Sequence, residues 1–407
     1  MNLSLFIARR YFRSKKKRNF ISIISNISMV GVAVGTMALV IVLSVFNGLE
    51  EMIRSFYGTF DPDLKVEAVK GKFFEVNEPF LEQIKNTEGV EVVTEVIEDN
   101  ALVRYKDAQQ VVKLKGVSPN YTQQQHIDKA IINGEFKLEE KDINYAVIGI
   151  GIRYTLGVAM GSDFYTLQVY YPKKGKIRGT TDPSKLTNRK LIKPSGVFNI
   201  ERAYDDFMFV PLDFAQELCE TGNKRTSLEI KVKNEANILE VKDLLSTLLG
   251  SNFKVQTRDE QHASILRAIK IEKLFVFIIL SFILGIVSFN TFFSLSMLAI
   301  EKKKDISVLY SMGADHKTIR RIFLFEGALI SFTGAFLGLI LGLLVCWLQQ
   351  TFGLISMGMQ TGVVDAYPVK MQALDFLYTS ISIIVITFLA SYRPAHIATK
   401  TEINTYL

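Results

Sequence analysis

The chain has 407 residues, of which 48% are hydrophobic and 22% are charged. Because both fractions are high, apolar and charged residues must be segregated along the sequence, which is typical of a membrane protein. The formal net charge of +7 sits largely in clusters that flank the apolar segments, so it does not indicate nucleic-acid binding. The two cysteines, Cys219 and Cys346, fall in different regions, and a disulfide between them is not expected.

Residues 1–20 are predicted to form a cytoplasmic amphipathic helix. Leu5 and Phe6 contribute to an apolar side, while Arg9 and Arg10 contribute to a basic one. This pattern is typical of a helix that lies on a membrane surface. A disordered basic tail is the alternative.

Four later segments are apolar enough to cross a bilayer, which requires about 20 residues to span about 30 Å of hydrocarbon. They are residues 21–49, 272–300, 322–348 and 374–392. Basic residues are retained on the cytoplasmic side of a membrane. They cluster before the first segment and between the second and third, whereas the connection 349–373 has one, Lys370. The sequence therefore predicts a multi-pass protein with both termini in the cytoplasm, including a tail over 393–407.

The long insertion at residues 50–271 is predicted to form a mixed α/β domain outside the cytoplasm. Apolar alternation and β-branched residues favour strands, and apolar residues three and four apart favour helices. Strands are predicted near 63–69, 101–106, 110–117, 145–149, 163–171, 207–211 and 226–233, and helices near 78–87, 212–220 and 235–249. Asn234 is the predicted cap of the last helix.

A strongly basic segment, residues 172–193, interrupts this domain and carries eight Lys or Arg and one acid, Asp182. A loop of this length is unusual in a compact domain unless it has a function or is disordered. Both interpretations, a solvated loop and a hairpin that docks a protein, remain open.

Glycines recur at four-residue spacing in two of the apolar segments. They are Gly31 and Gly35 in the first segment and Gly334, Gly338 and Gly342 in the third. Such ridges allow helices to approach closely, so we expect them to serve packing. Ionisable residues are missing from the middle of the spans, which argues against a proton or ion path. Asn290 is polar, and an interhelical hydrogen bond explains it adequately.

The motifs of several enzyme classes are missing. The two Gly-Lys pairs, at Gly71 and Gly175, are not part of a GxxxxGK[ST] phosphate loop, so the chain should not bind ATP in that manner. The sequence also lacks a G-x-S-x-G elbow and an HExxH zinc motif, and its four histidines lack metal-ligand spacing. We therefore expect a non-catalytic chain without a metal or cofactor of its own, which receives energy from another subunit.

The segment 301–321, between the second and third spans, is the most informative cytoplasmic stretch. Its apolar residues cluster on a short helix, which Gly313 should end, and Asp315 should cap the next helix. Such a helix suits insertion into a groove on a soluble partner. Lying on the membrane surface is the alternative.

Several stretches resemble one family of ABC permeases, which includes macrolide exporters and the cell-division permease. Residues 301–327 are similar to the family's coupling helix, and residues 391–395 (SYRPA) are similar to its ending. Within the family, residues 5–50, the run 363–369 (VVDAYPV) and the run 268–273 (AIKIEK) resemble lipoprotein-releasing permeases of the LolC/LolE type.

This resemblance implies a permease subunit in the bacterial inner membrane. Such permeases pair as dimers, either of one chain or of two related chains, with cytosolic ATPases that bind ATP and Mg. They take lipoproteins from the outer leaflet of the inner membrane and pass them to a periplasmic lipoprotein chaperone. A macrolide- or peptide-exporter-type permease, or a cell-division-type permease acting mechanically on periplasmic partners, is the alternative.

The resemblance also implies roles for three groups of residues. The ATPase-coupling residues would be Ile306, Val308, Leu309, Met312, Gly313 and Ala314. The chaperone-docking residues would be Lys173, Lys174, Lys176, Arg178, Arg189 and Lys190. The residues facing membrane lipids and lipoprotein acyl chains would be Val42, Phe46, Phe282, Phe289 and Asn290.

Overall fold

The chain divides into two compact units, which are described separately. The computed structural model describes residues 3–13, 20–124, 127–161, 165–173, 186–200, 202–357 and 366–399. One unit comprises Met1–Met52 and Ser264–Leu407, and we call it the helical unit. The other comprises Ile53–Ala263, and we call it the α/β unit.

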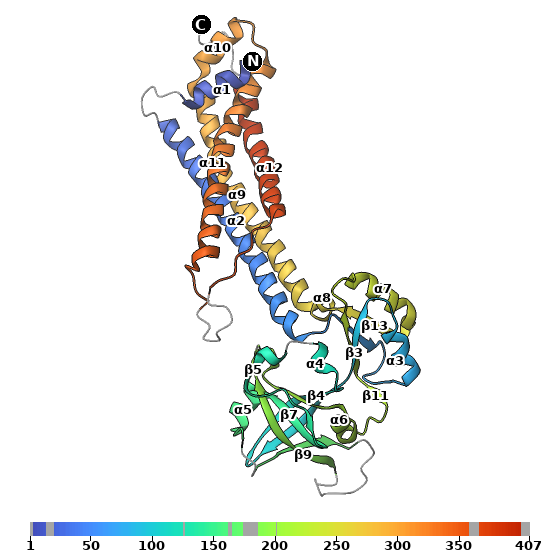
Figure 1. Ribbon diagram of the computed structural model, residues 1–407. Coiled ribbons are helices and arrows are strands. Elements are labelled where there is room, and N and C mark those ends of the chain that lie inside the picture. The colour runs from blue at the N-terminus through green and yellow to red at the C-terminus, as the bar shows by residue number, and fades with distance from the viewer. Residues whose placement is uncertain are drawn as a thin grey trace. The chain divides into compact units, whose positions relative to one another are not determined.

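The helical unit contains four long helices that run side by side (Figure 1). Its helices are α1 (Leu3–Arg13), α2 (Phe20–Phe60, which continues into the α/β unit), α9 (Ala263–Glu301), α10 (Lys303–Ser311), α11 (His316–Phe352) and α12 (Ala373–Ala398). Among the described residues, α2, α9, α11 and α12 are long and apolar enough to cross a membrane. Each contains one of the four apolar segments predicted from the sequence.

Glycines bring the backbones of α2 and α11 into close approach. A Cβ atom added at Gly334 or Gly338 would collide with a backbone carbonyl of α2, that of Met29 or Ala33. On another face of α2, Gly31 and Gly35 receive the side chains of Val287 and Leu284 from α9. The predicted role of the glycine ridges in helix packing is therefore confirmed.

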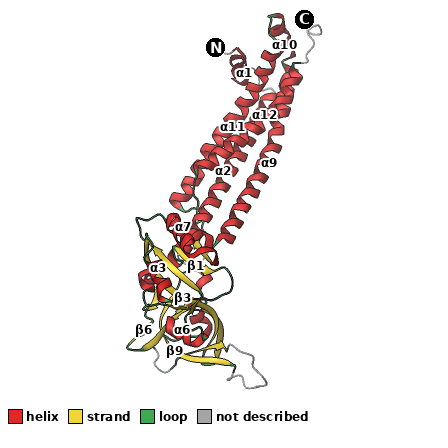
Figure 2. Cartoon of the chain, turned by 90° about the vertical axis from the view of Figure 1, so that its right-hand side faces the viewer, coloured by secondary structure: helices red, strands yellow, loops and turns green. Residues whose placement is uncertain are grey.

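The α/β unit contains a large sheet with short helices packed on it (Figure 2). Its strands are β1 (Leu64–Ala68), β2 (Phe74–Glu75), β3 (Val90–Tyr105), β4 (Ala108–Val117), β5 (Ile131–Gly134), β6 (Glu139–Glu140), β7 (Ile143–Gly149), β8 (Leu167–Pro172), β9 (Thr187–Phe198), β10 (Phe207–Pro211), β11 (Lys224–Arg225), β12 (Ser227–Val232) and β13 (Phe253–Thr257). Its helices are α3 (Glu78–Lys85), α4 (Tyr121–Gln124), α5 (Ile150–Leu156), α6 (Leu212–Cys219), α7 (Ile238–Leu249) and α8 (Arg258–Gln261).

The sheet has an open part and a closed part. The strand order is β13-β1-β12-β3-β4-β10-β7-β9-β5, and β8 pairs with both β3 and β9. The ring β3-β4-β10-β7-β9-β8 is therefore continuous and forms a small barrel, which removes the free edges of these strands. One apolar core joins alternate residues of the barrel strands with α5 and α6. Another packs α3 and α7 against β1, β12 and β13.

Most elements predicted in this unit are present. Predicted strands near 63–69, 110–117, 145–149, 207–211 and 226–233 correspond to β1, β4, β7, β10 and β12, and the predicted helices correspond to α3, α6 and α7. The predicted cap Asn234 is wrong, because α7 begins later and the Asn237 side chain accepts a hydrogen bond from the Leu239 N–H. The strand predicted at 101–106 is only the end of β3, which begins at Val90.

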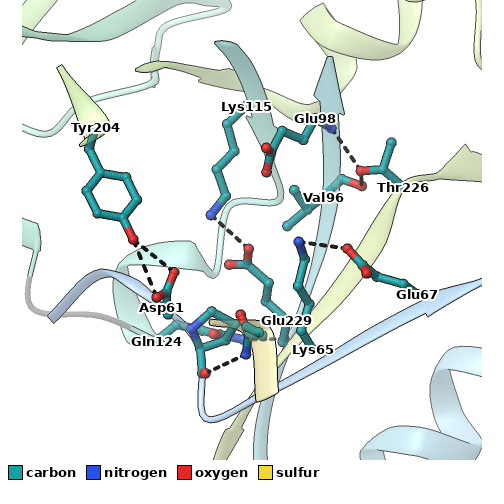
Figure 3. Close-up of polar contacts among 12 residues, drawn as sticks. Asp61, Lys65, Glu67, Val96, Glu98, Lys115, Gln124, Tyr204, Thr226 and Glu229 are labelled. Atoms are coloured by element: carbon teal, nitrogen blue, oxygen red, sulfur yellow. Dashed lines mark hydrogen bonds and ion pairs between the residues drawn. The ribbon is translucent and has the colours of Figure 1, made fainter. Parts of the chain in front are cut away.

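A buried ion pair connects two strands of the large sheet. Lys115 on β4 and Glu229 on β12 lie 2.7 Å apart, and their side chains are 3% and 2% exposed. Figure 3 shows this pair beside Gln124, whose amide donates to the Glu229 carbonyl. The ammonium group also lies 5.3 Å from the centre of the Tyr121 ring. A hollow of about 350 Å³ adjoins the pair, and Asp61 and His262 line its rim.

The first prediction compares Gly338→Ala with Gly285→Ala. Both variants gain the same helix propensity, but a Cβ at 338 meets the Ala33 carbonyl while a Cβ at 285 meets nothing within 4 Å. We expect the 338 variant to be less stable than the 285 variant by about 1–3 kcal/mol, the usual cost of overpacking. Thermal unfolding of the full chain in detergent measures the difference. Equal midpoints would contradict the packing role of Gly338.

The second prediction concerns the Lys115–Glu229 pair. Lys115→Met leaves a buried carboxylate without its counter-charge, which should cost about 3–5 kcal/mol of stability. The double variant Lys115→Met/Glu229→Leu removes both charges and should recover most of this loss. Urea-dependent proteolysis of the α/β unit in the full chain measures both. A double variant no more stable than the single variant would show that the strands need the ion pair itself.

Candidate functional site

The predicted coupling residues lie on and after α10, but they do not share one environment. Ile306 is 1% exposed and packs with Leu309 and Ala314 in an apolar cluster. Val308 and Met312 are instead 53% and 79% exposed. The six residues therefore divide into an inner anchor and an exposed apolar face, which the sequence pattern did not separate.

The ends of α10 have the predicted turn chemistry. The C-cap of α10 is Met312, and Gly313 follows with a φ of +90°, which glycine adopts without strain. The Asp315 side chain accepts a hydrogen bond of 2.8 Å from the Thr318 N–H at the start of α11. The predicted stop and cap are therefore confirmed, and the connection from α10 to α11 is a short, fixed turn.

Helix α1 packs beside α10, at what we call the α10 end of the helical unit. Ala8 is fully buried there, and the Ser4 hydroxyl donates to the Thr318 carbonyl at 3.4 Å. The Lys302 ammonium lies 5.4 Å from the centre of the Tyr11 ring. Burial, together with the carboxylates of Asp305 and Glu326, raises the pKa of Tyr11 to about 12. One side of α1 is thus held by protein.

The other side of α1 is open to its surroundings. Leu5, Phe6 and Phe12 are 45%, 45% and 39% exposed. Exposed apolar side chains next to exposed arginines suit a membrane surface, as predicted. At the same end, the Glu326 side chain in α11 is only 4% exposed.

The basic segment 172–193 is only partly a loop. Its two ends form the hairpin β8–β9, closed by a hydrogen bond of 2.9 Å from the Lys173 N–H to the Leu186 carbonyl. Arg189 and Lys190 lie on β9, so placing them in a loop was wrong. Lys190 is engaged within the unit, by an ion pair to Glu217. Lys174, Lys176 and Arg178 lie outside the described residues.

The predicted lipid-facing residues lie on two separate helices. Phe282 and Phe289 on α9 are 70% and 60% exposed, and Asn290 beside them is also exposed. Val42 and Phe46 on α2 are half-buried in the helical unit. The three residues on α9 are therefore more exposed than the two on α2.

Phe282 and Phe289 line a hollow of about 440 Å³ between α9 and α12, which we call the α9–α12 groove. Phe292 from α9 and Leu389 from α12 also line it, and Arg393 lies at its rim. The residues that the resemblance assigns to lipid contact come from α2 and α9, whereas this groove is lined by α9 and α12. The predicted residues Phe282 and Phe289 lie in this groove. The sequence did not indicate that α12 forms its other wall.

Sequence reasoning missed a polar network at the opposite end of the helical unit. The Lys273 ammonium lies 2.8 Å from the Asp375 carboxylate and donates to the Asn47 amide oxygen at 2.7 Å. The Asn47 amide in turn donates to the same carboxylate at 2.5 Å. Asn47 and Asp375 are 2% and 5% exposed. The network ties α2, α9 and α12 together, and the available signal was one polar residue just inside one end of each apolar run, charged in α9 and α12.

Among the residues that the structure describes, no group of three or more His, Cys, Asp or Glu side chains could hold a metal ion. In the network above, each of the three polar side chains is engaged by the other two. The features of the helical unit are the exposed apolar side of α10, the α9–α12 groove and the polar network that connects α2, α9 and α12.

Comparison with known proteins places these features in a family. The family model "MacB-like periplasmic core domain" matches residues 25–248, more than half of the chain, and "FtsX-like permease C-terminal" matches 277–403. The lipoprotein-releasing system transmembrane protein LolC of Neisseria meningitidis is 24% identical, over 98% of this chain and 98% of that protein. LolE of Haemophilus influenzae is 24% identical, over 99% and 98%.

Among solved structures, the periplasmic region of MacB from Actinobacillus actinomycetemcomitans is 11% identical, over 50% of this chain and 91% of that one. Its TM-score of 0.35 is too low to establish a common fold. The family assignment therefore rests on the sequence matches alone. The chain belongs to the family of permeases that combine a MacB-like periplasmic core domain with an FtsX-like carboxyl-terminal region, and its similarity to LolC/LolE-type members extends over nearly its whole length.

Proposed function

We propose that this chain is the permease subunit of an ABC complex that extracts lipoproteins from the outer leaflet of the bacterial inner membrane. A partner ATPase drives the extraction, and a periplasmic chaperone receives the lipoprotein. The observation that carries this proposal is the similarity to LolC and LolE proteins over nearly the whole chain. Similarity over a short stretch would indicate only a shared domain. Similarity over both units supports the same role in the same kind of complex.

In this proposal, α2, α9, α11 and α12 cross the membrane, and the α/β unit, which lies between α2 and α9 in the sequence, is periplasmic. The α10 end and both termini are cytoplasmic. The basic residues before α2 and between α9 and α11 support this orientation, because translocation of Lys and Arg is disfavoured. A second permease chain, identical or related, would complete the membrane part.

The exposed face of α10 is the proposed contact with the ATPase. Val308 and Met312 are spaced by one helical turn and are largely exposed, as expected of a helix that enters a groove. Ile306 and Leu309 connect the same helix to the apolar cluster of the α10 end. ATP and Mg would be bound by the partner, since this chain lacks a phosphate-binding loop. The chain would transmit force and would not be an enzyme.

The β8–β9 hairpin is the proposed chaperone-docking element. Its strands are anchored in the barrel by pairing with β3 and β7, so the hairpin has a rigid base. Arg189 packs on the Tyr170 ring, with 5.9 Å between the guanidinium carbon and the ring centre. An acidic surface on the chaperone would complement the basic residues of this segment.

The third prediction tests the function directly. The full chain is reconstituted in proteoliposomes with its second permease chain, the partner ATPase and a triacylated lipoprotein, and the chaperone is added outside. We expect ATP-dependent transfer of the lipoprotein to the chaperone. ATP-dependent appearance of a soluble peptide or drug, without lipoprotein transfer, would favour an exporter and overturn the proposal.

The fourth prediction tests the coupling face. Met312→Asp places a charge where an apolar side chain would be buried against the ATPase, and such burial is unfavourable. We expect ATPase affinity to fall at least about tenfold, which corresponds to about 1.4 kcal/mol. Quantitative pull-down of the ATPase measures this.

The matched control is Ile397→Asp, since Ile397 is 48% exposed on α12 at the same end. Its ATPase binding should be retained. Leu309→Asp is unsuitable as a test because Leu309 packs inside the cluster, and loss of folding would imitate loss of binding. Undiminished binding by Met312→Asp would remove α10 from the ATPase contact.

A further inference from the structure

The α9–α12 groove has the length of one membrane leaflet. On α9 it extends from Phe282 to Phe292. The ten steps from Phe282 to Phe292 rise about 15 Å at about 1.5 Å per residue. The hydrocarbon core of a bilayer is about 30 Å thick, so the groove matches half of it. Its volume of about 440 Å³ is within the range of pockets that hold small ligands, about 300–1,000 Å³.

The floor of the groove is open because of Gly285. A Cβ atom added there meets nothing within 4 Å, in contrast to Gly334 and Gly338, which have the α2 backbone against them. Helix packing within the chain therefore does not require glycine at this position. Its effect is to leave space between the rings of Phe282 and Phe289.

One end of the groove is polar and positively charged. Arg393 is the one charged residue among those that line it, and no acidic residue lines it. The next residue, Pro394, lies inside α12 and has no N–H. The carbonyl of Ala390, another lining residue, therefore lacks the donor that a helix normally supplies four positions later. A cation and a carbonyl that lacks its usual helical donor thus adjoin the end of the apolar groove.

We propose that the α9–α12 groove holds one acyl chain of an anionic phospholipid, whose phosphate pairs with Arg393. An arginine guanidinium forms two parallel hydrogen bonds with phosphate oxygens and suits this contact better than an ammonium group. The apolar length supplies room for a chain of one leaflet, and a headgroup hydroxyl can donate to the Ala390 carbonyl.

This inference rests on the proposed function for the membrane orientation of α9 and α12. Arg393 lies toward the α10 end, which is cytoplasmic in that proposal, so the lipid comes from the inner leaflet. The lipoprotein cargo enters from the outer leaflet and is a different ligand. A second copy of the chain is a less suitable occupant, because an apolar helix would leave the Arg393 charge without an anion.

The test is native mass spectrometry of the full chain, delipidated in mild detergent and titrated with phosphatidylglycerol or phosphatidylcholine. We expect one phosphatidylglycerol per chain to bind at least tenfold more tightly than phosphatidylcholine. Arg393→Gln should remove this preference, and Gly285→Leu, which fills the floor, should weaken binding of both lipids at least tenfold. The controls are Arg321→Gln and Val345→Leu, at exposed positions of α11, and they should bind like the original chain.

Three outcomes would overturn the inference. They are equal binding by all variants, displacement of the phospholipid by a triacylated lipopeptide at equimolar concentration, and a disulfide between two chains that each carry Phe289→Cys. The second would assign the groove to the cargo, and the third to a second copy. Lipoprotein release is measured separately: release without lipid binding refutes the groove alone, and lipid binding without release refutes the proposed function alone.

Discussion

The contact that organises the helical unit is the backbone-to-backbone approach of α11 to α2. Gly334 and Gly338 leave so little space that the carbonyls of Met29 and Ala33 fill the positions where side chains would be. In a membrane the hydrophobic effect does not drive helices together, so van der Waals contact of this kind must do it. The pair α2–α11 therefore forms a rigid centre. The other helices pack on it, α9 through Leu284 and α12 through Ile383, in one small apolar cluster.

A second constraint acts at the end opposite α10. The triangle of Asn47, Lys273 and Asp375 connects three helices that are far apart in the sequence. Burying two charges is costly unless each is paired and hydrogen-bonded, and here both conditions are met. The backbone of the segment before α12 joins the same region, since the Lys370 N–H donates to the Ser44 carbonyl at 2.9 Å. The network ties α9 to the first turn of α12, and the groove lies further along both helices.

Sequence reasoning predicted the features that depend on nearby residues. The length of the apolar segments predicted the long helices, and the four-residue glycine spacing predicted the packing ridges. Gly313 and Asp315 predicted the turn after α10. It failed where distant segments decide the outcome. Closure of the barrel needs β8 to pair with β3, more than 60 positions away, and nothing local in the lysine-rich run 186–193 indicates that it is a strand. The polar network at Lys273 was not predicted either, because its three residues are far apart in the sequence.

The candidate sites follow the same division. The sequence predicted one apolar coupling segment, but burial, which depends on α1 and α11, separates Ile306 and Leu309 from Val308 and Met312. In the groove, Phe282 and Phe289 were predicted as lipid-facing, while the contribution of α12 was invisible to periodicity. Arg393 belongs to the run SYRPA near the end of the chain, and its position beside the groove depends on how α12 packs.

The division of α10 into an anchored side and an exposed side has a mechanical consequence. A force applied to one side of a helix moves the neighbouring helices only if the opposite side of that helix is packed against them. Ile306 and Leu309 make this packing contact, in the apolar cluster that α10 shares with α1, α11 and α12. A single residue, Lys302, separates α9 from α10, and the four residues 312–315 separate α10 from α11. Connections this short can absorb little of a shift of α10, so in the proposed function a force on Val308 and Met312 would reach both α9 and α11. Because α9 also forms one wall of the α9–α12 groove, a displacement transmitted through Lys302 would reach the groove as well.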